Sequence, residues 1–266
     1  MQKIVDCHCH IYPEKIAERA VNGISSFYNI KMNSNGTVSD MIAAEAEAGV
    51  THCIVFSVAT KVAQVKSINE FIMGEVNRSV GFMTGLGTLH PLSPDIKGDI
   101  DHLMELGLKG VKLHPDIQGF KIDDYRCLKI YELCEKLGLP VLLHTGDYRY
   151  DFSNPNRIKP ILETYTGMTV IGAHFGGWSI WEKASMELAA YTNFYVDCSS
   201  SFYSLTPEKS VEIIRRYGAD RVLFGTDYPM WKPADEVKYL ESLSLTEEEK
   251  QRIYYKNAKR LFGLSI

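Results

Sequence analysis

The chain has 266 residues, of which 45% are hydrophobic, so it can bury a large core in one or two domains. Its net charge is −4 and its basic residues are scattered, which argues against a nucleic-acid-binding protein. No apolar run approaches the roughly 20 residues that span a bilayer, and the chain opens on a strand pattern instead of a signal peptide. We therefore expect a cytoplasmic protein.

The six cysteines include no C-x-x-C pair, and most of them fall within expected strands or helices. Loop positions, where disulfides staple small domains, hold few of them. We expect reduced, buried cysteines that pack as small apolar side chains.

Apolar, β-branched runs alternate with amphipathic helical patterns along the whole chain. The expected strands are residues 3–10, 51–56, 80–89, 110–114, 139–144, 168–174, 193–198 and 221–225. The expected helices are residues 14–22, 40–48, 64–77, 99–106, 124–137, 154–165, 178–191, 207–217, 234–242 and one that starts at residue 246. Ser39 is the expected cap of helix 40–48, and Thr246 with Glu249 forms a capping-box pattern.

Strands that alternate with helices predict a parallel sheet, and eight such units predict its closure into a (β/α)8 barrel. The alternative is an open, doubly wound sheet, but no G-x-G-x-x-G follows the first strand. We expect a single TIM-barrel domain over residues 1–266, with an extra helix at the C-terminus.

Most of the histidines fall where expected strands end, which is the working face of such a barrel. Six of the eight histidines are placed there, together with one aspartate after the last strand: His8, His10, His90, His114, His144, His174 and Asp227. This bias favours a metal site over scattered structural histidines.

The first strand places Asp6, His8 and His10 on one face, because side chains alternate along a strand. Two imidazoles at a strand end can hold a metal ion from one side, and His144 and Asp227 can complete the ligand set. Zinc is the first expectation; manganese or a second metal are alternatives. Asp227 can also accept a proton, and we expect Asp6 to support the ligands rather than to react.

The remaining candidates surround this set. His174 precedes two glycines and is expected to move protons near the ion; a further ligand or a loop-fixing histidine are the alternatives. Lys112 and His114 share one face of a strand, where His114 can contact substrate or brace a ligand. Lys112 can pair with an anion or bind substrate, or carry a carbamate that bridges two metals. Arg149 and Tyr228 lie in loops suited to a small acidic or flat carbonyl compound, or cover core.

Five motifs, in this order along the chain, resemble the amidohydrolase superfamily: Asp6-x-His8-x-His10, Gly-x-Lys-x-His-Pro, Leu143-His144-Thr145-Gly146, Ala173-His174-x-Gly-Gly and Phe224-Gly225-Thr226-Asp227-x-Pro229. The resemblance is nearest to the amidohydrolase-related branch, which includes decarboxylases of aminocarboxymuconate-semialdehyde and γ-resorcylate. The terminal helix of that branch also resembles the ending Asn257-Ala258-x-x-Leu261-Phe262-Gly263.

The resemblance implies a (β/α)8 barrel with a divalent metal, usually zinc. It implies that His8, His10, His144 and Asp227 are ligands and that His174 is the acid/base residue. Binuclear members carry a carbamylated lysine or a glutamate on the fourth strand, and the pairing of a lysine with a histidine there favours one metal. The chain is shorter than the decarboxylases of the branch, so their substrates are not transferred to it.

Three functions follow from these expectations. The preferred one is a metal-dependent hydrolase, in which activated water attacks a C=O or C=N carbon of a small molecule. The alternative is a non-oxidative decarboxylase of a small aromatic or unsaturated acid. The third is a barrel that only binds its ligand. We expect a small-molecule substrate, no nucleic-acid or membrane partner, and a possible homodimer.

Overall fold

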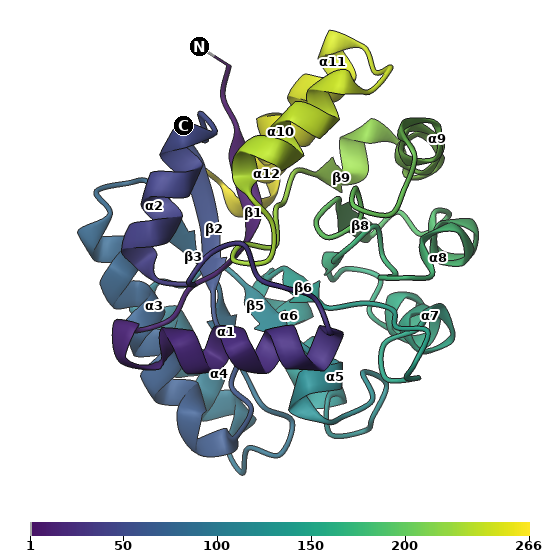
Figure 1. The fold of residues 1–266 in the computed structure, drawn as a ribbon. Helices are drawn as coiled ribbons and strands as arrows, with labels where there is room; N and C mark the ends of the chain where they lie inside the picture. The colour runs from purple at the N-terminus through teal and green to yellow at the C-terminus, as the bar shows by residue number, and fades with distance from the viewer. Residues whose placement is uncertain (1) are drawn as a thin grey trace.

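The structure, a computed structural model, describes residues 2–266 as a parallel barrel ringed by helices (Figure 1). The strands are β1 (Val5–His10), β2 (His52–Phe56), β3 (Met83–Gly85), β4 (Gly87–Thr88), β5 (Val111–Leu113), β6 (Val141–Leu143), β7 (Val170–Gly172), β8 (Phe194–Asp197) and β9 (Val222–Leu223). Every pairing between neighbouring strands is parallel, in the order β1-β2-β3 and β4-β5-β6-β7-β8-β9.

Two seams join these sheets into a closed barrel. At one seam, Cys7 N donates to Phe224 O at 2.9 Å and His10 N donates to Tyr228 O at 2.8 Å, so β1 follows β9. At the other, β3 and β4 are the two halves of one strand that is interrupted at Leu86. Helix α4 packs closely there, since a Cβ on Gly87 would lie 2.3 Å from the side chain of Leu103. The expected (β/α)8 barrel is confirmed.

The helices cover the outside of the barrel. They are α1 (Glu14–Tyr28), α2 (Val38–Glu47), α3 (Val65–Arg78), α4 (Ile96–Leu106), α5 (Pro115–Gln118), α6 (Leu128–Leu137), α7 (Pro155–Thr164), α8 (Trp181–Leu188), α9 (Pro207–Tyr217), α10 (Pro233–Ser242), α11 (Glu247–Gln251) and α12 (Asn257–Phe262). Two short 3-10 helices are η1 (Val62–Gln64) and η2 (Ala219–Arg221), and a π-helical segment, η3 (Arg252–Lys256), joins α11 to α12. Helix α1 differs from the others because it runs across the front of the strands (Figure 1).

Several boundaries differ from the sequence-based expectations for local reasons. The cap of α2 is Thr37, not Ser39, because the Thr37 hydroxyl accepts from Asp40 N. The third strand does not begin at residue 80, because Val80 has a positive φ of 50° and is 94% exposed. Helix α8 starts late, since Ser179 has a φ of 64°.

Other expectations hold. The capping box of Thr246 and Glu249 is present, and the terminal helix α12 buries Ala258 and Phe262. All six cysteines are free and buried. Within residues 2–266, no helix combines the length and the apolar character that crossing a membrane requires.

Candidate active site

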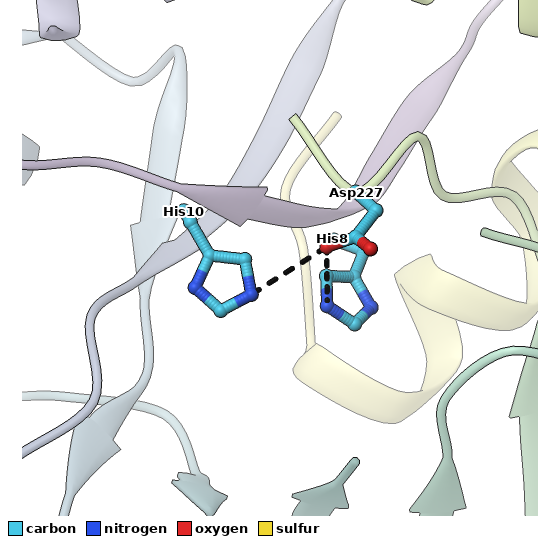
Figure 2. A group of neighbouring side chains, drawn as sticks. All are labelled: His8, His10 and Asp227. Carbon is cyan, nitrogen blue, oxygen red and sulfur yellow. Dashed lines mark ion pairs between the residues drawn. The ribbon is translucent and has the colours of Figure 1, made fainter. Parts of the chain in front are cut away.

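Two elements that are far apart in the sequence bring His8, His10 and Asp227 together (Figure 2). Both histidines come from the end of β1, and the aspartate comes from the loop after β9. Asp227 Oδ1 lies 3.3 Å from His8 Nε2 and 3.6 Å from His10 Nε2. The three side chains are at most 12% exposed. Asp227 has a positive φ of 61°, a conformation that costs energy in most residues and is common at functional sites.

A buried carboxylate fixes the orientation of His8. His8 Nδ1 lies 2.8 Å from Asp197 Oδ2, and a carboxylate only accepts, so Nδ1 carries the proton and Nε2 keeps its lone pair. Asp197 Oδ1 in turn accepts from the backbone of His174 and Ser199. The sequence analysis missed Asp197, although an acidic residue at the end of a strand was the available signal.

The donor set fits a divalent cation. His8 presents the lone pair of Nε2 and Asp227 an oxygen, and both point at the same space as His10 Nε2. Burial lowers the pKa of His8 and of His10 well below the usual value, so both rings are in the neutral form that binds metals. The carboxylate on His8 Nδ1 is also typical of metal-binding histidines.

Lys112 is the fourth group at this point. Its Nζ lies 3.2 Å from His8 Nε2 and 4.9 Å from the centre of the Phe56 ring. Burial lowers the pKa of Lys112 to about 8. The side chain is 0% exposed and lies inside the barrel beside His8.

His174 and His144 lie beside the donor cluster. His144 Nδ1 is 3.1 Å from His174 Nε2, and His174 Nδ1 donates to Ser199 O at 3.0 Å. Burial lowers the pKa of His174 to about 3, so this ring is also neutral. His144 stacks on His114 at 4.0 Å and groups with that residue and Asp116, not with Asp227.

Helix α1 contributes a phenol that the sequence analysis missed. Tyr28 Oη lies 2.8 Å from His114 Nε2 and 3.4 Å from His144 Nε2. The helix was expected to end at residue 22, six residues before Tyr28, so nothing pointed to this side chain. Asp116 was missed as well: its Oδ1 is buried without a partner among residues 2–266, and burial raises its pKa to about 6.

The other predicted residues, Asp6, Tyr228 and Arg149, do not line the cavity. Asp6 accepts from Thr226 and from His8 N, which braces the turn before Asp227. Tyr228 Oη donates to Asp40 at 2.7 Å. Arg149 pairs with Asp147 and donates to Phe27 O, the last turn of α1.

A cavity of about 960 Å³ opens above the cluster. Its floor is formed by histidines and aspartates from the strand ends, and α1 and α3 form its walls. The floor residues are His8, His10, His114, Asp116, His144, His174 and Asp227. A volume of this size accommodates a small organic molecule.

The model of the family described as "Amidohydrolase" matches residues 5–264. The chain belongs to the amidohydrolase family. Within it, a γ-resorcylate decarboxylase from Polaromonas sp. (strain JS666 / ATCC BAA-500) is 34% identical over 73 residues. That stretch is 27% of this amidohydrolase-family chain and 22% of the relative, so the match spans about a fifth of the relative's length.

Solved structures resemble this family member over its whole length. An uncharacterised TIM-barrel protein from Bordetella bronchiseptica has a TM-score of 0.82 at 20% identity, covering 98% of this chain and 99% of its own. A dihydroxybenzoic acid decarboxylase from Polaromonas sp. JS666, with bound manganese and 2-nitroresorcinol, has a TM-score of 0.76 at 17% identity, covering 100% and 98%. At these identities the similarity establishes the barrel fold.

Proposed function

We propose that this amidohydrolase-family chain is a metal-dependent decarboxylase of a small aromatic acid. The observation that carries the proposal is the cluster of His8, His10 and Asp227 on the floor of a cavity large enough for an aromatic ring. The similarity to decarboxylases supports this reaction over the hydrolysis that the sequence motifs alone favoured.

The cluster would hold one divalent ion through His8 Nε2, His10 Nε2 and Asp227 Oδ1. Imidazole and carboxylate ligands suit zinc and manganese alike, and manganese is the ion bound in the Polaromonas structure. When bound, the ion supplies positive charge that holds the carboxylate and a neighbouring hydroxyl of the substrate. His144 would join as a ligand only after turning from His174 toward the cluster.

The protein's own groups can move the protons. Burial raises the pKa of the Asp227 carboxyl, whose Oδ1 would bind the ion and whose Oδ2 remains to carry a proton. We assign it to donate that proton to the ring carbon that bears the carboxylate. The carbon–carbon bond then breaks, its electron pair restores the aromatic ring, and carbon dioxide leaves.

His174 has the opposite role in this scheme. Its Nδ1 proton is bound to Ser199 O, so Nε2 is an acceptor directed into the cavity floor. It can accept a hydrogen bond from a ring hydroxyl, and as the hydroxyl proton moves toward Nε2 the ring becomes richer in electrons and easier to protonate. Tyr28 remains a neutral donor, because burial raises its pKa well above the usual value.

The test is a panel of hydroxybenzoates, lactones and amides, assayed with metal-free protein and with protein loaded with manganese or zinc. We expect carbon dioxide from at least one hydroxybenzoate in the loaded protein, and none without metal. Addition of water to a lactone or an amide, without release of carbon dioxide, would replace this proposal with the hydrolase. If the metal-loaded protein neither releases carbon dioxide nor adds water to a substrate, the function that remains is ligand binding without catalysis.

A further inference from the structure

One face of α1 lines the cavity with cations, while its acidic residues point elsewhere. Lys15 and Arg19 belong to the cavity wall, one helical turn apart. Glu14 and Glu18 are on the same helix and, like the two cations, are exposed, but they do not line the cavity. The helix thus separates its charges by sign, with the positive row toward the cavity.

The two cations have no counter-charge of their own. Within residues 2–266, neither Lys15 nor Arg19 forms an ion pair or a side-chain hydrogen bond within the usual distance limits. Like charges spaced four apart on a helix repel each other by a few tenths of a kcal/mol. The facing wall offers Thr60, Gln64 and Ser67, which are polar but uncharged. The hydroxyls of Thr60 and Ser67 already donate to Gln64, so an anion held here would take its donors from the two cations and would meet no carboxylate.

Helix α1 also sets the distance between the two cations and the end of the cavity where Tyr28 contacts His114. Tyr28 contacts His114 on the floor, and Arg19, which also lines the cavity, lies nine residues earlier on the same helix. At a rise of about 1.5 Å per residue, this separates the two positions by about 14 Å along the helix. Between them, Ile24 and Phe27 give the wall an apolar surface suited to a ring. The cavity is thus acidic and histidine-rich at its floor, apolar in the middle and cationic at its outer end.

We propose that Lys15 and Arg19 form a second anion subsite, so that the substrate is an elongated acid with a carboxylate or phosphate at the end opposite the reacting carboxylate. This inference rests on the proposed decarboxylase for the assignment of the reacting end. The reacting carboxylate lies on the floor, the apolar body lies along α1, and the distal anion pairs with the two cations.

The test measures affinity by titration calorimetry, on the manganese-loaded full chain. The probes are a biphenyl monocarboxylate, the biphenyl dicarboxylate with one acid at each end, and the monocarboxylate with a phosphate at its far end. Comparing the last two probes identifies the preferred anion. The variants are Lys15→Gln and Arg19→Gln, and Lys66→Gln is the control, an exposed lysine on α3 that does not line the cavity.

We expect the wild type to bind one of the doubly charged probes about tenfold more tightly than the monocarboxylate, as a charge-assisted hydrogen bond would give. Each of the two variants should lose most of this preference without weaker binding of the monocarboxylate, and Lys66→Gln should keep it. Three results would overturn the subsite. The wild type could bind all probes equally, it could fail to bind either doubly charged probe, or the preference could survive in both variants. Because affinity is the readout, a subsite that is present without release of carbon dioxide would contradict only the proposed reaction.

Discussion

His8 donates a hydrogen bond from Nδ1 to Asp197 Oδ2 at 2.8 Å, and both side chains are at most 1% exposed. This contact fixes the ring so that Nε2 faces Asp227. Replacement of Asp197 by Asn should lower the affinity for manganese or zinc by about 10- to 100-fold, as loss of such supporting carboxylates does. Metal titration of the variant measures it. Asp101→Asn, at an exposed helix position, is the control, and unchanged affinity in Asp197→Asn would contradict the assignment.

Metal content should separate the ligands from the proton-transfer group. His10→Ala and Asp227→Ala should both lower the amount of bound metal, because both side chains belong to the donor cluster. His174→Asn should retain the metal and lower turnover by about a hundredfold or more, since it removes an acid/base group. Asparagine tolerates the left-handed backbone that His174 adopts, with a φ of 60°. Loss of the ion in His174→Asn would show that His174 is a ligand.

The hydroxyl of Tyr28 should matter for turnover more than for stability. Tyr28→Phe removes the hydrogen bond to His114 and the donor beside His144, and keeps the ring that packs on Trp178. We expect the free energy of unfolding to fall by about 1 kcal/mol, and kcat to fall about tenfold. Steady-state kinetics and urea denaturation measure both effects. Tyr125→Phe, at a residue that is 78% exposed, is the control. An unchanged kcat would remove Tyr28 from the site.

Glu236 should make stability depend on pH. Burial raises the pKa of Glu236 from 4.5 to about 8, and its Oε2 has no partner among the described residues. Between these two values the folded state holds a proton that the unfolded state has released. Stability from this group therefore falls as the pH rises, by up to about 1.4 kcal/mol per pH unit.

Glu236→Gln removes this titration. Urea denaturation at pH 5, 7 and 9 should show the variant gaining stability relative to the wild type as the pH rises. Glu47→Gln, at an exposed position of α2, is the control that removes a carboxylate outside the core. Parallel pH profiles for wild type and Glu236→Gln would mean that the Glu236 carboxyl titrates normally.

The barrel was readable from the sequence because strands and helices differ in hydrophobic period. The strand ends could therefore be placed, and with them His8, His10 and Asp227, which depend on nothing but the order of the elements. The end of α4 at Leu106 was also readable, because a glycine, Gly107, follows it. The late start of α8 was not, because it depends on the backbone conformation of Ser179.

The remainder of the site depends on tertiary packing that no local pattern encodes. Tyr28 reaches the floor because α1 crosses the barrel mouth, and the position of a helix across a barrel is set by contacts far along the chain, such as Arg149 to Phe27 O. Arg149 was expected near substrate on the basis of its charge and its loop. In the structure, the guanidinium of Arg149 forms an ion pair with Asp147, two residues earlier in the chain.

The most direct measurement is the anomalous scattering of manganese in crystals of the loaded protein. The account predicts a peak within bonding distance of His8 Nε2, His10 Nε2 and Asp227 Oδ1, with Asp197 still bonded to His8. An empty cluster in crystals that contain ample manganese, or a peak elsewhere in the barrel, would contradict it.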